Sequence, residues 1–331
     1  GTVLKKDFII SNKVDMAEHT KALGLIEKSR YILIVTHVNP DPDSIGSALA
    51  LSNLFHENKI KHKVFNVSAD LPQNLDFIPR FDKISDQLPA FFDLIITVDC
   101  GTFKRLGFTP DPSIPIINFD HHKSNNHFGV VNIVDPMKSS TAELVFEFFK
   151  HNGLYITKDS ATALYVGIYD DTLAFSLGRC DELTFEKTNF LVECGASPSE
   201  IANKLLRRDS LAKYRIIPKV LNSLELFKEG EVASIFAKEE WFKETGAHNR
   251  DCEDALDMIM SIAIVKIAFF VRVVNGVSRV SLRSKGKIDV AKIAGEFDGG
   301  GHYNAAGCTL DMIDVEKAKE IVLKEIFEVY K

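Results

Sequence analysis

The chain has 331 residues, of which 45% are hydrophobic and 26% are charged. This balance is typical of soluble globular proteins, and the length suits two domains with separate cores. No apolar run reaches the roughly 18 residues of a membrane-spanning helix, and the net charge of −6 argues against a protein that coats long nucleic acid by electrostatic attraction.

The charged residues and the cysteines bear on the kind of substrate and on the cellular compartment. Residues 260–292 contain seven Lys or Arg residues and a single acid, Asp289. Such a patch suits a small anionic substrate, although a solvated basic face is an equally good interpretation. The five cysteines are scattered and form no Cys-x-x-Cys pair. We therefore expect free thiols, a cytoplasmic location and no membrane partner.

The first half of the chain alternates strand-like and helix-like segments. Three apolar runs of strand length cover residues 31–36, 94–98 and 114–119. A helical pattern at residues 47–57 and another strand candidate at residues 62–67 lie between the first two. This alternation predicts βαβ units, and thus an α/β fold with a doubly wound, mostly parallel sheet.

Two helix starts and a domain boundary follow. Ser140-Thr141-Ala142-Glu143 and Ser197-Pro198-Ser199-Glu200 both have the spacing of a capping box. The charged, weakly patterned stretch at residues 204–213 favours a boundary there. We predict an N-terminal domain over residues 1–203, a linker over 204–225 and a second domain over 226–331.

The last third has the pattern of a smaller α/β domain. Residues 267–274 and 277–283 read as two strands joined by Asn275-Gly276, a dipeptide that favours a type I′ hairpin turn. In the second strand, alternation places Arg279, Ser281 and Arg283 on one face. The chain ends with a predicted helix over residues 315–330.

Potential metal ligands follow each of the three apolar runs. Because the carboxyl ends of parallel strands share one edge of a sheet, we expect these side chains to converge. Carboxylates together with imidazoles suit Mn²⁺ and similar cations. The residues are, in chain order, His37, Asp41, Asp43, Asp99, Asp120, His121 and His122.

Each of these motifs has a simpler explanation when it stands alone. A strand-end acid such as Asp99 is more often a turn or helix cap, the segment from His37 to Asp43 could be a polar turn, and adjacent histidines occur by chance. Pro40 and Pro42 instead predict a stiff ligand loop around Asp41. Clustered carboxylates repel one another without cations, so three motifs at one sheet edge favour a metal site.

The ordered motifs resemble those of the DHH phosphoesterase superfamily over nearly the whole chain. The segment from His37 to Ser47 resembles its first motif, Asp99 its second, and Asp120-His121-His122 its third. A fourth motif spans residues 167–172, with Asp171 as the ligand rather than its neighbour Asp170. Residues 299–307, which begin Gly299-Gly300-Gly301-His302, resemble the signature of the DHH-associated C-terminal domain.

Two positions depart from the family pattern. Pro42 and Leu173 stand where relatives often have glycine. The proline bears on the rigidity of the first ligand loop, and the leucine bears on the shape of the pocket beside Asp171. Neither substitution removes an expected ligand.

The resemblance implies a cleft between the two domains that holds two divalent cations, most often Mn²⁺, with Mg²⁺ or Co²⁺ as alternatives. One cation would be bound by His37, Asp41 and Asp99. The second would be bound by Asp43, Asp99, His121 and Asp171. Asp120 would orient a neighbouring ligand, and His122 would contact the substrate phosphate or the leaving oxygen. The implied substrate contacts are Arg105, Arg283, Gly299, Gly300, Gly301 and His302.

The closest resemblance is to the NrnA-type subgroup. It implies hydrolysis of very short oligoribonucleotides from one end, including dinucleotides such as pGpG, and removal of the 3′-phosphate of 3′-phosphoadenosine 5′-phosphate. We therefore expect short RNA or a mononucleotide bisphosphate as the partner, and we leave a homodimer open.

The sequence leaves several other functions open. They are a RecJ-like exonuclease on single-stranded DNA, a manganese pyrophosphatase, a cyclic-dinucleotide phosphodiesterase, and a nucleotide-binding regulator without turnover. A RecJ-like enzyme would usually carry an additional basic, aromatic OB-fold, which no segment here resembles. The presence of every expected ligand argues against the regulator.

Overall fold

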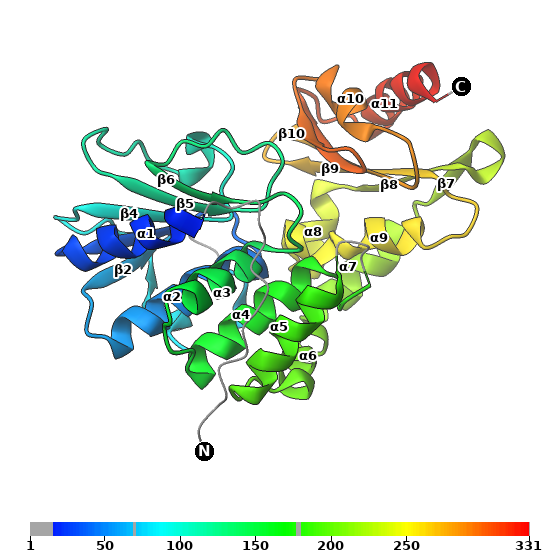
Figure 1. The fold of residues 1–331 in the computed structure, drawn as a ribbon. Helices are drawn as coiled ribbons and strands as arrows, with labels where there is room; N and C mark the ends of the chain where they lie inside the picture. Colours follow the sequence, from blue (N-terminus) through cyan, green and yellow to red (C-terminus); the bar gives the residue numbers. More distant parts are fainter. Residues whose placement is uncertain (1–15, 69–70, 177–179, 331) are drawn as a thin grey trace. The chain divides into compact units, whose positions relative to one another are not determined.

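The computed structural model describes residues 16–68, 71–176 and 180–330. They form two compact units that divide between Arg208 and Asp209 (Figure 1). Each unit has its own sheet, and we describe each by itself. None of the described helices is long and apolar enough to cross a membrane.

The N-terminal unit is built on a six-stranded parallel sheet with the strand order β3-β2-β1-β4-β5-β6. The strands are β1 (Ile32–Thr36), β2 (His62–Phe65), β3 (Ile84–Ser85), β4 (Leu94–Val98), β5 (Ile116–Asp120) and β6 (Val131–Val134). The helices are α1 (Met16–Lys28), α2 (Pro42–Glu57), α3 (Thr141–His151), α4 (Lys158–Asp171), α5 (Glu182–Glu193) and α6 (Pro198–Leu206), with short 3₁₀ turns at η1 (Gln73–Leu75), η2 (Phe81–Lys83) and η3 (Phe103–Leu106).

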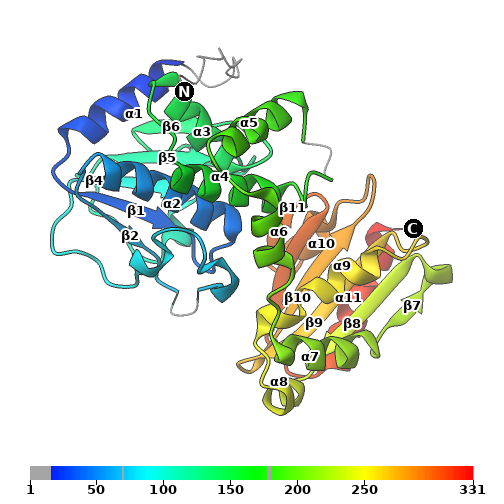
Figure 2. The same cartoon turned by 90° about the horizontal axis from the view of Figure 1, so that it is seen from below.

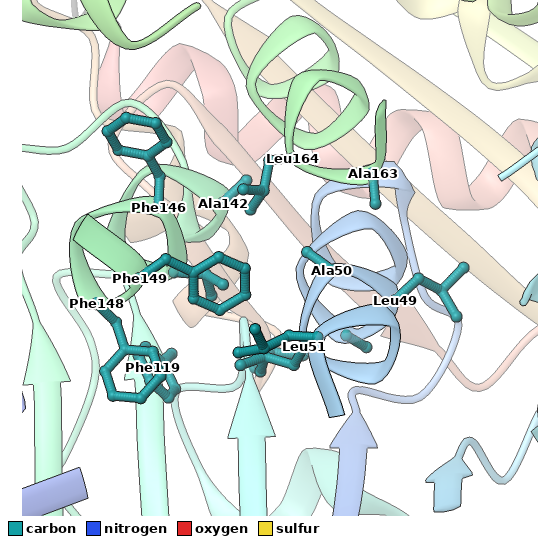
Figure 3. Packing of buried hydrophobic residues seen from close by; sticks show 14 of the residues in the cluster. Leu49, Ala50, Leu51, Phe119, Ala142, Phe146, Phe148, Phe149, Ala163 and Leu164 are labelled. Carbon is teal, nitrogen blue, oxygen red and sulfur yellow. The ribbon is translucent and has the colours of Figure 1, made fainter. Parts of the chain in front are cut away.

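The main core of this unit lies between the sheet and its helices. The strands β1, β4 and β5 are buried along their whole length, as expected for parallel strands covered on both faces. Phe148 of α3 packs edge-on against Phe119 of β5, with ring centroids 5.4 Å apart. Figure 3 shows Phe149 of α3 and Leu51 of α2 in the same cluster. A smaller apolar cluster around Leu33 and Ile95 covers the opposite face.

The register of the sheet determines which residues emerge at its carboxyl edge. Thr36 of β1 pairs with Val98 of β4, and Val98 pairs with Phe119 of β5. The next residues, His37, Asp99 and Asp120, therefore lie side by side at this edge, and Asp120 is still the last residue of β5.

The helix α2 begins earlier than the sequence pattern predicts. It starts at Pro42 rather than at residue 47. Asp41 is the N-cap, and its carboxylate accepts a hydrogen bond from the backbone N–H of Ser44 at 2.9 Å. Proline at the first helical position fits this start because the missing N–H has no partner there anyway. The stiff loop predicted around Asp41 is therefore shorter, and Asp43 already lies in the helix.

The two predicted capping boxes differ in detail from expectation. Ser140 caps α3 by accepting from the backbone N–H of Glu143. The Glu143 carboxylate accepts from the N–H and hydroxyl of Ser139, one residue before the cap. Ser197 precedes α6 as expected, but its side chain makes no cap hydrogen bond.

The C-terminal unit contains a second six-stranded sheet with the order β11-β12-β10-β9-β8-β7, in which only β8 and β9 pair in parallel. Figure 2 shows β7, β8, β9 and β10 side by side. Its elements are α7 (Leu211–Leu221), β7 (Glu225–Phe227), η4 (Lys228–Gly230), β8 (Val232–Ala237), α8 (Glu239–Thr245), η5 (Asn249–Cys252), α9 (Asp254–Met260), β9 (Ile267–Val274), β10 (Val277–Ser284), α10 (Val290–Gly295), β11 (Gly300–His302), β12 (Ala305–Leu310) and α11 (Val315–Val329).

Two cores cover the two faces of this second sheet. One cluster joins β9, β10 and β12 to α10 and α11, and the other joins β8 and β9 to α7 and α9. Figure 1 shows α10 and α11 on one side of this sheet and α7 and α9 on the other. The hairpin predicted at Asn275-Gly276 is present, and both residues have the positive φ that the type I′ turn requires. The prediction of an α/β protein with a parallel sheet and a second α/β domain is confirmed.

Candidate metal centre

The structure brings the six candidate metal ligands together at the carboxyl edge of the first sheet. Five of them follow strand ends or open α2, and Asp171 is the last residue of α4. They fall into overlapping groups of three residues, and the ligand atoms of each group lie within 4.8 Å of one another.

The first group contains His37, Asp41 and Asp99. The Nε2 atom of His37 lies 3.4 Å from Asp41 Oδ2 and 3.3 Å from Asp99 Oδ2. The backbone behind His37 is held firmly, because Asn66 Nδ2 donates to the His37 carbonyl at 2.7 Å. One imidazole and two carboxylates thus converge from β1, the α2 cap and β4.

The second group contains Asp43, His121 and Asp171. The Nε2 atom of His121 lies 3.1 Å from Asp171 Oδ2 and 3.6 Å from Asp99 Oδ1. Asp99 thus stands between the two groups, with one carboxylate oxygen toward His37 and the other toward His121. A third overlapping group contains Asp99, His121 and His122.

Asp43 and Asp99 are oriented by the start of α3. The backbone N–H groups of Thr141 and Ala142 donate to the two oxygens of Asp43 at 2.7 and 3.0 Å. The Thr141 hydroxyl donates to Asp99 Oδ1 at 3.0 Å. The N-terminus of a helix favours a carboxylate in this position. Sequence reasoning identified this helix start but missed that it contacts the candidate ligands.

The helices α2 and α4 approach closely at two glycines. A Cβ on Gly46 would lie 2.5 Å from the carbonyl oxygen of Ala163. A Cβ on Gly167 would lie 2.7 Å from Asp43 Oδ1. The close approach of the two helices therefore fixes where Asp43 and Asp171, one from each helix, stand relative to each other.

Burial and mutual charge shift the pKa values in this cluster. Burial, followed by the charges of Asp99, Asp171 and Asp41, raises the pKa of Asp43 well above its usual range. Burial also opposes ionisation of Asp99, but His122 and His37 outweigh it and hold its pKa well below the usual range. Burial lowers the pKa of His37, yet Asp41 and Asp99 raise it to about 9.

Asp120 and His122 form a hydrogen-bonded pair beside this cluster. The Nδ1 atom of His122 lies 2.7 Å from Asp120 Oδ1 and 3.3 Å from Asp99 Oδ1. Burial lowers the pKa of His122, but Asp120 and Asp99 raise it to about 10. Asn125 donates to the other oxygen of Asp120 at 2.6 Å, which fixes the carboxylate. Asn125 is a further contributor that the sequence pattern did not reveal.

Arg105 is the sequence-predicted substrate residue that lies in the N-terminal unit. It belongs to η3, which directly follows the Asp99 loop, and its side chain is exposed. Its carbonyl accepts from the backbone N–H of Val38 at 2.8 Å, which ties this turn to the segment after His37.

The other sequence-predicted substrate residues lie in the C-terminal unit. Arg283 lies on β10, where its Nε atom is 3.6 Å from Asp257 Oδ1. Gly300 and Gly301 belong to β11, which pairs with β12. Two of the three glycines are therefore strand residues, and Gly299 directly precedes the strand. The backbone of His302 lies in the same strand, while its side chain lies outside the described part of the structure.

The donor set fits divalent cations. Carboxylate oxygens and imidazole nitrogens are the ligands of Mn²⁺ and similar ions. Burial and the neighbouring carboxylates also push Asp43 toward protonation, and a bound cation would favour its charged form instead. Residues of these types at these distances could therefore hold metal.

Comparison with known proteins gives matches in both units. Residues 31–168 match the DHH family, N-terminal domain, and residues 231–330 match the DHHA1 domain. The chain is 31% identical over 300 residues to a bifunctional oligoribonuclease and PAP phosphatase NrnA of Thermus thermophilus, covering 90% of this chain and 89% of the relative. It is 26% identical over 295 residues to the protein of the same name from Bacillus subtilis, covering 88% and 93%.

A solved structure agrees with these matches. An exopolyphosphatase-related protein from Bacteroides fragilis superposes with a TM-score of 0.89 at 26% identity, covering 96% of this chain and 98% of that one. The family resemblance of the sequence motifs is thereby confirmed. With a DHH domain, a DHHA1 domain and a relative 31% identical over most of its length, the chain belongs to the DHH family.

Proposed function

We propose that this protein is a metal-dependent phosphodiesterase and phosphatase that degrades very short oligoribonucleotides, including dinucleotides such as pGpG, from one end. We further propose that it removes the 3′-phosphate of 3′-phosphoadenosine 5′-phosphate. The observation that carries the proposal is the set of overlapping carboxylate and imidazole groups that share Asp99 and His121. The relatives from Thermus thermophilus and Bacillus subtilis, named bifunctional oligoribonuclease and PAP phosphatase, support oligoribonucleotides and the bisphosphate as substrates.

In this proposal the six clustered residues hold two divalent cations, with Mn²⁺ as the preferred ion. His37, Asp41 and Asp99 bind one, and Asp43, Asp99, His121 and Asp171 bind the other. When bound, such cations supply a water nucleophile of low pKa and positive charge for the transferring phosphoryl group. Asp99 directs one oxygen toward His37 and the other toward His121, so it would contribute to both ligand groups.

The remaining residues would handle protons and substrate. Asp120 engages Nδ1 of His122 and thereby orients the ring, whose opposite edge would meet a substrate oxygen. A protonated His122 would donate to the leaving oxygen or to a phosphate oxygen. Arg283, Arg105, His302 and the backbone of residues 299–301 would bind phosphate, because a guanidinium fork and unobstructed N–H groups suit that anion.

The two units would divide these tasks. We assign catalysis to residues 1–203 and substrate binding to residues 226–331. Residues 204–225 would connect them, and this segment includes α7, which packs into the core of the C-terminal unit. The five cysteines are free thiols. We therefore place the protein in a reducing cytoplasm.

A competition assay tests the substrate assignment. Purified protein with Mn²⁺ is given RNA dimers to pentamers, long RNA, single-stranded DNA, 3′-phosphoadenosine 5′-phosphate and pyrophosphate. We expect the RNA dimers and the bisphosphate to be hydrolysed fastest. Faster cleavage of long RNA or DNA would instead favour a RecJ-like exonuclease.

A variant tests the catalytic assignment. Asp99→Asn removes the shared carboxylate charge, and we expect it to abolish Mn²⁺-dependent hydrolysis. Asp82→Asn is the matched control, because Asp82 is an exposed acid of the same unit. Binding of nucleotide without turnover by the native protein would favour the regulator.

A further inference from the structure

A buried network of four charged side chains lies behind the candidate metal centre and contributes no ligand to it. It contains Lys187 of α5, Glu143 and Glu147 of α3, and Lys138 of the preceding loop. The side chains of all four are at most 8% exposed. The Nζ atom of Lys187 lies 3.0 Å from Glu143 Oε1 and 2.8 Å from Glu147 Oε1, and Lys138 pairs with Glu147.

A buried network of charges contributes little net stability to a fold. Removing charges from water costs free energy that their mutual attraction only partly offsets, and apolar residues of similar size are often as stabilising. Here Lys187 holds two carboxylates at once, and the Glu143 pKa is lowered despite its burial because Lys187 and Ser139 stabilise the charged form. Packing alone therefore does not account for these four buried charges.

The network fixes one short segment of the chain, residues 138–142. Glu143 Oε2 accepts from both the N–H and the hydroxyl of Ser139 at 2.8 Å. Glu143 Oε1 accepts from Thr184 of α5 at 3.1 Å in addition to Lys187. Lys138, which precedes Ser139, pairs with Glu147. The start of the segment is thus held by both carboxylates, and its end continues directly into Glu143, which Lys187 holds.

The same segment contacts three of the six candidate ligands. The N–H groups of Thr141 and Ala142 orient Asp43, and the Thr141 hydroxyl orients Asp99. The Lys138 carbonyl lies 3.4 Å from Nδ1 of His121, the ring nitrogen opposite the one that faces Asp99 and Asp171. A shift of residues 138–142 would therefore move ligands of both candidate groups together.

We propose that Lys187 is a positioning residue for the metal centre, acting through Glu143 and Glu147 on the segment of residues 138–142. The inference rests on the proposed metal site but not on the proposed substrates. Removal of a residue that orients metal ligands without binding the metal itself typically changes metal affinity by about 10- to 100-fold.

Metal affinity distinguishes this role from simple stabilisation. In the full chain, we compare Lys187→Met, which keeps the length of the side chain and removes its charge, with Lys187→Arg, which keeps the charge. Lys319→Met is the matched control, because Lys319 pairs with Glu225 at 2.8 Å in the C-terminal unit and is also mostly buried. Thr184→Val is a milder variant that preserves the shape of the side chain. It removes the hydroxyl that lies 3.1 Å from Glu143 Oε1 and 3.2 Å from Asp181 Oδ1, while the backbone N–H of residue 184 still donates to Asp181.

The readouts are Mn²⁺ affinity by calorimetry and the visible absorption spectrum of bound Co²⁺, which reports ligand geometry. We expect Lys187→Met to weaken Mn²⁺ binding by about 10- to 100-fold and to alter the Co²⁺ spectrum, with Lys187→Arg closer to the native protein. Thr184→Val should lose affinity in the same direction, and Lys319→Met should bind like the native protein. At saturating Mn²⁺ the KM for substrate should be unchanged, because the network does not contact substrate.

Native Mn²⁺ affinity and Co²⁺ spectra in both Lys187→Met and Thr184→Val would overturn the proposal. If Lys187→Met does not fold, the Mn²⁺ affinity and Co²⁺ spectrum of Thr184→Val alone test the proposal. If the native protein binds Mn²⁺ but hydrolyses no phosphoester, the proposed function is wrong, whereas this inference is unaffected. If the native protein binds no divalent ion, both are wrong.

Discussion

His19 lies on α1 with its side chain fully buried, and neither ring nitrogen makes a hydrogen bond within the described residues. Its ring lies 5.2 Å from that of His151 on α3 and stacks on Phe148. Burial, followed by the nearby His151, lowers the pKa of His19 to about 4, while Glu18 opposes the shift and Lys138 adds to it. The neutral form is therefore the one that the fold accommodates.

This burial predicts a pH-dependent loss of stability. The unfolded chain takes up a proton on His19 below about pH 6.5, whereas the folded protein resists it until about pH 4. Stability should therefore decrease as the pH falls through this window, by about 3 kcal/mol in full. Urea unfolding of the native protein and of His19→Leu should give a shallower pH dependence for the variant. Equal pH slopes for the two proteins would contradict the assignment.

Gly301 offers a second test at the residue scale. Its φ is +148°, and a Cβ there would lie 2.4 Å from the Ala305 carbonyl oxygen. Gly300, its neighbour in β11, has open space around a Cβ. Gly301→Ala should therefore destabilise the C-terminal unit by about 1–3 kcal/mol, while Gly300→Ala should be nearly neutral. Thermal unfolding measures both, and similar values for the two would refute the argument.

At the scale of elements, the close packing of α2 against α4 predicts how a larger side chain between them would affect stability and metal binding. Gly46→Ala should force the helices apart, because the Ala163 backbone cannot give way as a flexible side chain would. We expect a stability loss of about 1–3 kcal/mol from overpacking, together with weaker Mn²⁺ binding, since Asp43 and Asp171 would separate. Gly24→Ala on α1 is the control, because nothing lies near its Cβ. It should be neutral or stabilising by helix propensity, by about 1 kcal/mol.

The elements also show what a single sequence can predict. Strands such as β1 and β4, and the hairpin at Asn275-Gly276, carry local signals in their apolar runs and turn residues. The start of α2 was predicted too late because Asp41 and Pro42 were interpreted as loop residues, although the same pair is an N-cap followed by a first-turn proline. The same two residues are thus compatible with a stiff loop and with a helix start, and the sequence alone does not distinguish the two.

The contacts between distant elements could not be predicted. Asp43 and Thr141 are 98 positions apart, and their hydrogen bond depends on how α3 packs against α2. The pairing of Lys187 with Glu143 likewise joins two helices whose spacing the chain does not encode locally. Convergence of the strand-end residues was predictable because parallel strands share an edge, whereas the residues that orient them were not.

At the scale of the whole molecule, separate cores predict separate responses to metal. The candidate ligands all lie in the N-terminal unit, while the C-terminal unit has its own two apolar clusters. Mn²⁺ at 100 times its Kd should stabilise the N-terminal unit by about 2.7 kcal/mol. Calorimetry should show its transition move upward with Mn²⁺ and return with a chelator. An equal shift in the Asp99→Asn variant would show that the ion binds elsewhere.

The backbone of Asp99 has a practical consequence for how this position can be altered. Its φ is +56°, a left-handed conformation that asparagine and aspartate tolerate better than other residues with a side chain. Alanine there would combine the loss of a carboxylate with a main-chain preference for a different conformation, so its phenotype would have two sources. Asparagine preserves both shape and torsion angle, so a kinetic comparison reports only on the carboxylate group itself, which loses its negative charge and exchanges one acceptor oxygen for an amide donor.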